Sequence, residues 1–441
     1  MEKEYGKMLK RSFWAGLLML APSFALAQDL PQRGPYLSTV SQNSIIVNWR
    51  TVTMDSSVVR YGLTTGYGNE EKNVTLTTAH SLTLTSLLPD TVYHYRVLFQ
   101  GKQTPDYTFR TGVNSDIPFK FCVYGDTRTQ ADSHLAVVNR MVTFDPYFVL
   151  HTSDLVANGS DESQWAVYFA TSCSSATAAQ RFPFYYAIGN HEGESPLYYN
   201  YFYLPHNNPD STESYYSFDY GNSHFISLDT QKPYGPSSAQ YQWLRKDLVN
   251  AYNKTFIFVF MHDHPYCAGG HNSNLGLRDT LCPLFQTFKV DMVFSGHSHF
   301  YQRNGPINGV TYIITDGGGA PLYTPAESSW TKHAEKAHHF VDFTVWADSL
   351  KFKMVRTDGS IGDSLIYQAQ NKSPLLLGDP NSDGAINVAD VIYLISYLFK
   401  GGPVPLPISE SGDANCDGKV NVADIVYLVA YLFKGGPKPG C

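Results

Sequence analysis

Six side chains that suit a pair of metal ions each follow an apolar segment of the chain. They are Asp126, Asp154, Asn190, His262, His297 and His299. Two divalent metal ions at close range need a shared anionic ligand, and a carboxylate can bridge them. Imidazoles suit zinc, iron or manganese, and an amide oxygen adds a ligand without further negative charge. A centre of this kind polarises phosphoryl oxygens and generates hydroxide near neutral pH, which is the chemistry of phosphate-ester hydrolysis.

Each of these sequence elements is a weak signal when it occurs alone. A Gly-Asp or Asn-His pair is commonly part of a turn, and a single His-x-His is more often not a metal site. Five elements in succession, each directly after an apolar segment, are hard to explain as turns. We therefore predict that the six side chains meet around metal ions. Gly125, Gly189 and Gly296 precede three of them and are expected to allow a sharp backbone turn at the strand end.

Alternating strands and helices must position these side chains. Apolar strands are predicted at 119–124, 147–150, 184–188, 256–261 and 292–294, and helices at 131–143, 161–171 and 239–250. This alternation indicates an α/β core. Chemistry in such folds gathers where strands end and loops begin, which is where the candidate ligands lie.

The segment before this core, about residues 31–112, has a different pattern. Polar and apolar residues alternate at 44–49, 57–62 and 91–97, with turn residues between these predicted strands. This spacing is typical of a small β-sandwich. The stretch 87–93 resembles the tyrosine corner of fibronectin type III domains, which assigns structural roles to Tyr93 and Trp49.

An acidic motif near the C-terminus occurs twice, and each copy leads into an apolar helix that ends Tyr-Leu-Phe-Lys-Gly-Gly-Pro. The duplication indicates a separate module, at about 376–441. Ca²⁺ takes oxygen ligands at spaced positions of such a loop. The predicted calcium ligands are Asp379, Asn381, Asp383, Asn387 and Asp390 in the first loop, and Asp413, Asn415, Asp417, Asn421 and Asp424 in the second.

Each calcium loop closes with Asp, where an EF-hand has Glu. Paired loops that are each followed by one helix resemble type I dockerin domains. The resemblance implies two Ca²⁺ ions and a cohesin-type partner, and therefore tethering to a scaffold or a surface, including a polysaccharide-associated one.

The order of the candidate metal ligands resembles that of the calcineurin-like metallophosphoesterases, and of the purple acid phosphatase branch in particular. That branch also carries a fibronectin-like domain in front, so the resemblance covers about residues 31–370, including the stretch 315–320. It implies a catalytic domain at about 117–370 with two sheets flanked by helices. It also implies that Asp154 bridges two ions, with Asp126 and His299 on the first ion and Asn190, His262 and His297 on the second.

The same resemblance implies roles for three further histidines. His191 matches the general acid or phosphate-contacting histidine, and His271 matches a histidine that lines the substrate pocket. His264 follows a candidate ligand closely and is expected either to ligate or to shape its loop.

Three positions depart from the family pattern. Ala157 stands where the family has a tyrosine ligand, Ser153 where it has glycine, and Arg128 where other metallophosphoesterases have the histidine of Asp-x-His. The first ion therefore lacks both extra ligands, and Arg128, which cannot ligate a metal, is a candidate phosphate contact. His134 is a candidate replacement ligand, with a core or surface role as the alternative. Without a tyrosinate we predict no purple iron chromophore, and the two ions can be Fe, Zn, Mn or Mg.

The composition excludes some partners. A chain of 441 residues exceeds one hydrophobic core, and 31 Tyr and 26 Phe with only 16% charged residues are typical of β-rich extracellular proteins. A net charge of −7 without a basic patch argues against nucleic acid as a partner.

The N-terminus predicts export. Basic residues, the apolar run 13–20 and Ala25-Leu26-Ala27 match a signal peptide at 1–27, so we expect a secreted or cell-surface protein. An uncleaved anchor is the alternative, but the run ends at Pro22 and is short for a membrane span. No later stretch approaches the length of a transmembrane helix.

Six cysteines in an exported chain permit disulfides. Cys416 with Cys441 and Cys267 with Cys282 are the candidate pairs, and Cys122 is expected to be a buried thiol.

These features predict a secreted phosphatase that hydrolyses phosphate monoesters with a hydroxide activated by two metal ions. A phosphodiesterase or nucleotidase on the same site is one alternative, which the loops around 195–215 and 263–280 would decide. A degenerate core whose outer modules serve adhesion is another, favoured by Ala157 and Arg128.

Overall fold

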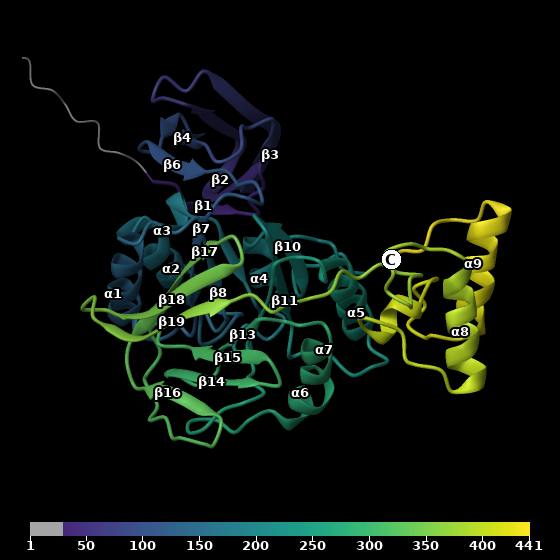
Figure 1. Ribbon diagram of the computed structural model, residues 1–441. Coiled ribbons are helices and arrows are strands. Elements are labelled where there is room, and N and C mark those ends of the chain that lie inside the picture. The colour runs from purple at the N-terminus through teal and green to yellow at the C-terminus, as the bar shows by residue number, and fades with distance from the viewer. Residues whose placement is uncertain (1–29) are drawn as a thin grey trace, which may run out of the picture.

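The computed structural model describes residues 30–441, so the predicted signal peptide at 1–27 lies outside the described residues. Figure 1 shows a β-rich N-terminal part, a central body of sheets flanked by helices, and a C-terminal pair of helices. This arrangement confirms the predicted fold class, with an α/β core between a β-rich and a helical module. Across residues 30–441, no helix is both long and apolar enough to cross a membrane.

The N-terminal part is one sheet with six strands. They are β1 (Arg33–Ser38), β2 (Ile45–Gly62), β3 (Asn69–Leu84), β4 (Val92–Phe99), β5 (Lys102–Gln103) and β6 (Tyr107–Arg110). The prediction of separate strands at 44–49 and 57–62 was wrong, because β2 runs through both. Residues 50–57 contain no glycine or proline, and β2 continues through them with shifts in the register of its pairing with β3.

Trp49 and Tyr93 have structural roles, as predicted. Trp49 is fully buried, and its ring stacks on His80 with centroids 4.7 Å apart. The Tyr93 hydroxyl accepts a hydrogen bond of 3.0 Å from the peptide N–H of Leu88, the kind of bond that a tyrosine corner makes.

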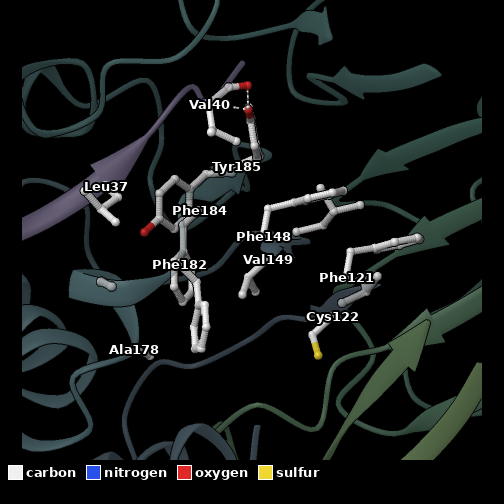
Figure 2. Close-up of a cluster of buried hydrophobic side chains, with 14 of the residues drawn as sticks. Leu37, Val40, Phe121, Cys122, Phe148, Val149, Ala178, Phe182, Phe184 and Tyr185 are labelled. Atoms are coloured by element: carbon white, nitrogen blue, oxygen red, sulfur yellow. Dashed lines mark hydrogen bonds between the residues drawn. The ribbon is translucent and has the colours of Figure 1, made fainter. Parts of the chain in front are cut away.

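The N-terminal sheet packs on the central body through polar contacts. Arg33 donates to Glu162 at 2.6 Å, and the Tyr95 hydroxyl donates to the carbonyl of Gln180 at 2.8 Å. Figure 2 shows the junction, where the peptide N–H of Val40 donates to the Tyr185 hydroxyl at 3.0 Å. The N-terminal sheet therefore braces the body at a distance from the candidate ligands.

The central body contains two further sheets. The first has the order β19-β18-β17-β7-β8-β9, and the second has the order β10-β11-β12-β13-β15-β14-β16. The strands are β7 (Phe119–Tyr124), β8 (Phe148–His151), β9 (Phe184–Tyr186), β10 (Tyr216–Tyr220), β11 (Ser223–Leu228), β12 (Phe256–Met261), β13 (Met292–Ser295), β14 (Tyr301–Ile307), β15 (Val310–Thr315), β16 (Thr331–Glu335), β17 (His339–Trp346), β18 (Ser349–Arg356) and β19 (Ile361–Gln368).

Aromatic side chains join these two sheets face to face. Phe121 of β7 lies 5.5 Å from Phe258 of β12, centroid to centroid, and stacks on Phe148 of β8 at 5.3 Å. Figure 2 shows part of this buried cluster. Strands β7, β8 and β9 are parallel, and so are β11, β12, β13 and β15. Their carboxyl ends therefore meet along one edge of each sheet.

The helices of the body lie between these strands in the sequence. They are α1 (Ala131–Val142), α2 (Glu162–Phe169), α3 (Ala178–Arg181), α4 (Pro196–Tyr201), α5 (Ala239–Ala251), α6 (Leu275–Thr280) and α7 (Cys282–Thr287). The predicted helix at 161–171 ends as α2 at Phe169 and continues as a π-helix over Ala170–Ser175.

The C-terminal module consists of α8 (Val388–Lys400), a short 3₁₀ turn (Ser409–Gly412) and α9 (Val422–Lys434). Leu394 and Leu428 form its small core, and a disulfide joins Cys416 to Cys441 as predicted. Arg245 of α5 joins the module to the body, because its guanidinium lies 2.9 Å from the carboxylate of Asp413.

The other candidate disulfide was wrong. Cys267 and Cys282 are both free and buried, and the Cys267 thiol donates to the carbonyl of Gly269 instead. Cys122 is a buried free thiol, as expected.

A buried histidine on β11 holds the outer edge of the second sheet. His224 contacts Asp219 through Nδ1 at 2.7 Å and Asp247 through Nε2 at 2.8 Å. Burial opposes the charged imidazolium, but the two carboxylates outweigh it and raise the pKa of His224 to about 9.

His224→Gln should therefore destabilise the protein in a pH-dependent way. The folded-state pKa lies above the unfolded value, so the contribution of His224 is complete below about pH 6 and is lost as the pH rises through about 9. We expect the variant to lose on the order of 2 kcal/mol at the lower pH and much less above about pH 10. Thermal unfolding across this range measures the difference, with the exposed His94→Gln as control. A pH-independent difference would contradict the assignment.

Candidate metal centre

The candidate ligands come from the facing strand ends of the two central sheets. Asp126, Asp154 and Asn190 follow β7, β8 and β9. His262 follows β12, and His297 and His299 follow β13. Side chains as much as 173 positions apart in the sequence therefore come within 3.0 to 3.5 Å of one another.

The side chains proposed for the second ion converge closely. The Asn190 Oδ1 atom lies 2.7 Å from His262 Nε2, and that nitrogen lies 3.5 Å from the nearer Asp154 oxygen. The rings of His262 and His297 are 4.9 Å apart, centroid to centroid. Asp263, which sequence reasoning passed over, also has a carboxylate oxygen within 4.8 Å of ring nitrogens of both histidines. This donor set fits a transition-metal ion.

The side chains proposed for the first ion surround a guanidinium. His299 Nε2 lies 3.0 Å from Asp126 Oδ1. The Arg128 Nε atom lies 3.4 Å from Asp154 Oδ2 and 3.7 Å from Asp126 Oδ1, and an Arg128 Nη2 donates to His299 Nε2 at 3.2 Å. Arg128 thus points into the ligand set itself.

Three of the six candidate ligands have an unusual backbone conformation. The φ angles of Asp126, Asp154 and His297 are 52°, 52° and 70°. Residues with a side chain seldom adopt such angles, and where they do, the surrounding structure must enforce them. Strain of this kind often accompanies functional sites.

The glycines before the ligands serve close packing, and the expectation of a turn at these glycines was wrong. Gly125, Gly189 and Gly296 have no positive φ. A Cβ at Gly125 would lie 1.9 Å from the hydroxyl of Thr152, and one at Gly189 would lie 2.0 Å from the hydroxyl of Ser153. The sharp turn falls on the following ligand, because the neighbouring loops approach too closely for any side chain at the glycine.

Glu192 ties the loops of two candidate ligands together. Its buried carboxylate accepts hydrogen bonds from the peptide N–H groups of Leu155 at 2.8 Å, Gly189 at 3.0 Å and Asp154 at 3.1 Å. It also accepts from the Ser153 hydroxyl at 2.9 Å, which gives the departure at position 153 a structural role. Sequence reasoning placed Glu192 in its motif but did not foresee this role.

Asp316 is a second buried carboxyl group behind the centre. It accepts a hydrogen bond of 2.7 Å from the Thr152 hydroxyl. Burial and the neighbouring charge of Asp126 raise the pKa of Asp316 well above its ordinary value.

Two of the other predicted histidines, His191 and His271, are partly or largely exposed beside the candidate ligands, whereas His264 is buried. His191 Nδ1 pairs with the carbonyl of Ala157 at 2.8 Å, and its Nε2 lies 3.7 Å from Asp154 Oδ2. His271 stacks on His297 with ring centroids 3.9 Å apart. His264 shapes its loop, because its Nε2 lies 2.9 Å from the hydroxyl of Ser298.

His134 lies in the core of the domain. It stacks on Tyr168, and its Nε2 lies 3.3 Å from the Tyr124 hydroxyl. Burial lowers the pKa of His134 to about 3. Together with Ala157 and Arg128 it lines a cavity of about 280 Å³ beside the first ion's ligands.

The two acidic loops have matching geometry. Asp379 accepts hydrogen bonds from the peptide N–H groups of Asp383 and Gly384, and Asp413 does the same in the second loop. Asn387 and Asn421 cap α8 and α9, each in a capping box with the closing Asp. Burial and the neighbouring Asp379 and Asp383 raise the pKa of Asp390 to about 6. A bound cation would offset this accumulation of negative charge.

Comparison with protein families identifies all three parts. The calcineurin-like phosphoesterase model matches residues 119–301, the purple acid phosphatase N-terminal domain matches 32–111, and the dockerin type I domain matches 377–433. The chain therefore carries a calcineurin-like phosphoesterase domain behind a purple acid phosphatase N-terminal domain. Dinuclear metal centres are typical of purple acid phosphatases, and this chain has two clusters that could hold metal ions, Asp126 with Asp154 and His262, and His262 with Asp263 and His297.

Several curated proteins are similar to this chain. An uncharacterized protein of Mycobacterium tuberculosis is 28% identical over 325 residues, which cover 61% of each chain. A purple acid phosphatase of Glycine max is 29% identical over 55% of this chain and 56% of its own length. The chain thus spans about six tenths of the length of the first relatives. The Fe(3+)-Zn(2+) purple acid phosphatase 12 of Arabidopsis thaliana is 24% identical over 81% of this chain and 82% of its own.

Solved structures agree with the fold. The purple acid phosphatase PPD1 from yellow lupin seeds superposes with a TM-score of 0.66 at 20% identity, covering 76% of this chain and 74% of that one. PhoD gives a TM-score of 0.63 at 14% identity, covering 79% and 92%.

Glu192→Gln should disturb the loops of both candidate ligands, Asp154 and Asn190. The amide nitrogen of Gln cannot accept the peptide N–H groups that the carboxylate accepts, and orphaned buried donors cost about 1–3 kcal/mol each. We expect a loss of stability of that order or more, and metal affinity lowered by about 10–100-fold, as for residues that orient ligands. Calorimetric metal titration and thermal unfolding test this, with the exposed Glu70→Gln as control. Unchanged metal affinity would exclude a positioning role.

Calcium should stabilise the C-terminal module. Calcium at about a hundredfold excess over its Kd adds about 3 kcal/mol per site if the unfolded loops do not bind it. We expect added Ca²⁺ to raise the midpoint of thermal unfolding of the module, and the double variant Asp383→Ala, Asp417→Ala to abolish the rise. The exposed Asp358→Ala is the control. A rise that survives in the double variant would show that these loops do not bind the ion.

Proposed function

We propose that this chain is an exported, metal-dependent phosphatase that hydrolyses phosphate monoesters at the centre between the two sheets. The observation that supports this most is the convergence of Asp154, Asn190 and His262 within 3.5 Å contacts at strand ends from both sheets. Metal ions bound there would supply Lewis acidity toward phosphoryl oxygens and a water of lowered pKa.

The side chains at the entrance suit a dianionic substrate. His191 Nδ1 pairs with the carbonyl of Ala157, which orients the ring and leaves Nε2 facing the centre. The side chain of His191 is 29% exposed, so a leaving-group oxygen can reach it. A protonated Nε2 would donate its proton to that oxygen as the ester bond breaks. His271, stacked on His297, adds a second imidazole that a phosphate oxygen can contact.

A phosphodiesterase is the second candidate, and one observation favours it. The cavity of about 280 Å³ beside Arg128 has apolar walls that include Val156, Val167 and Tyr168. It has room for a second ester substituent next to the centre. An adhesion protein with a degenerate core is disfavoured by the assembled ligand set.

Export and tethering belong to the same proposal. The predicted signal peptide and the dockerin type I domain, which is typical of extracellular cellulosome components, both support export. Apolar side chains are exposed at equivalent positions of the two C-terminal helices, namely Ile392 and Phe399 on α8 and Val426 and Phe433 on α9. Such a repeated apolar face suits a protein partner of the cohesin type.

Asp154→Ala tests the centre. The change removes the carboxylate that both ligand sets share, so we expect transition-metal content to fall and hydrolysis of p-nitrophenyl phosphate to drop by more than the 10–100-fold typical of residues behind the ligands. The exposed Asp348→Ala is the matched control. Comparison with bis(p-nitrophenyl) phosphate separates monoesterase from diesterase activity.

If the parent protein neither binds a transition metal nor cleaves either ester, the enzyme proposal fails and only the adhesion reading is left.

A further inference from the structure

Arg128 occupies the position where the first ion's ligands converge. Its side chain is only 15% exposed, and its guanidinium nitrogens lie 3.2 to 3.7 Å from His299, Asp154 and Asp126. A guanidinium stays charged at every physiological pH. It therefore neutralises two carboxylates whose burial would otherwise be costly.

The contact with His299 also blocks a ligand atom. His299 Nδ1 lies 2.8 Å from the carbonyl of Pro321, which can only accept, so Nδ1 carries the proton of the neutral ring. The Nε2 lone pair is then the one that a metal would use, and Arg128 donates into it. A cation entering this position must break that bond and meet a positive charge at close range.

The second position has no such competitor. In the part of the chain that the structure describes, no lysine or arginine forms a hydrogen bond or ion pair with Asn190, His262 or His297. The two halves of the centre therefore differ in charge before any metal arrives.

Neither of the two positions considered for a replacement ligand, Ala157 and His134, compensates at the first position. Ala157 has no ligand atom, and His134 is engaged with Tyr124 and Tyr168 in the core. The cavity lined by Arg128 adjoins the site and gives the displaced side chain room to move.

We propose that Arg128 competes with metal for the first position. The second position, formed by Asn190, His262 and His297, binds its ion first and tightly. The first position, formed by Asp126 and His299, fills only when the guanidinium moves out. This inference rests on the proposed function, since it concerns the same centre.

Metal titration of the full-length, metal-free protein tests the proposal. Mn²⁺ binding is followed by calorimetry, with Ca²⁺ present to saturate the C-terminal loops. We expect two binding steps whose Kd values differ by at least about 100-fold, or a single step if the competition is strong. Arg128→Ala should lower the Kd of the weaker step by at least about tenfold, the scale on which ligand-supporting residues alter metal affinity. If the parent shows a single step, the variant should show a second one. Arg128→His, which restores Asp-x-His, should tighten it further. Arg140→Ala is the matched control, because Arg140 is a half-buried arginine in the last turn of α1 that donates to the carbonyl of Thr357.

Two further variants keep the test decisive if an Arg128 variant does not fold. His299→Ala should remove only the weaker step, and His297→Ala should remove the tighter one. Equal affinities in the parent, or a weaker step unaffected by Arg128→Ala, would overturn the proposal. A parent with two equal steps that still cleaves p-nitrophenyl phosphate overturns this inference alone. Two unequal steps without hydrolysis overturn the proposed function alone.

Discussion

The structure depends on the burial of two carboxylates, Asp126 and Asp154, at one point between two sheets. Isolated buried charges are strongly unfavourable, so a protein that keeps them must supply cations, hydrogen bonds or both. This chain places three histidines, an amide and a guanidinium around them. The aromatic packing of β7 against β12 and β13, and of β8 against β11, brings the strand ends together. The fold thus concentrates negative charge and the means to offset it at the same place.

The loops behind the centre are held by a small set of bonds. Glu192 accepts hydrogen bonds from peptide N–H groups of the segments that carry Asp154 and Asn190, and Asp316 accepts one from the Thr152 hydroxyl. The glycines before the ligands allow these segments to approach within distances that no side chain would permit. This close approach is accompanied by positive φ angles at three of the candidate ligands, Asp126, Asp154 and His297, and the surrounding hydrogen bonds hold the backbone in this conformation. Preorganisation here is a property of the backbone as much as of the side chains.

Much of this could be predicted from the sequence. Strands β7 and β12 begin and end where the apolar runs do, and the six candidate ligands lie at strand ends because their motifs follow those runs. The fold class and the Cys416–Cys441 disulfide were also predicted correctly. These features are encoded locally, by periodicity, motif and repeat.

What sequence reasoning missed depends on distant parts of the chain. The Glu192 carboxylate accepts a hydrogen bond from a segment nearly forty positions away in the sequence. The long Arg128 side chain is oriented by its hydrogen bond to His299, which lies across the interface of the two sheets. Cys267 and Cys282 flank a loop in the sequence, yet each is buried as a free thiol. The prediction treated 44–49 and 57–62 as separate strands, whereas β2 continues between them through Val52 and Met54, which are exposed.

The ion pair between Arg245 and Asp413 gives the joint between the body and the C-terminal module a definite character. Both side chains are shielded from solvent, and Asp413 is also the first residue of the second acidic loop. The Asp413 carboxylate therefore takes part both in the second acidic loop and in the joint between the body and the C-terminal module. On a scaffold, the catalytic body would then project from its anchor in a set direction, with little of the free swing that a linker of glycine and serine confers. Cation binding at the second acidic loop and the orientation of the central body would therefore be coupled through Asp413.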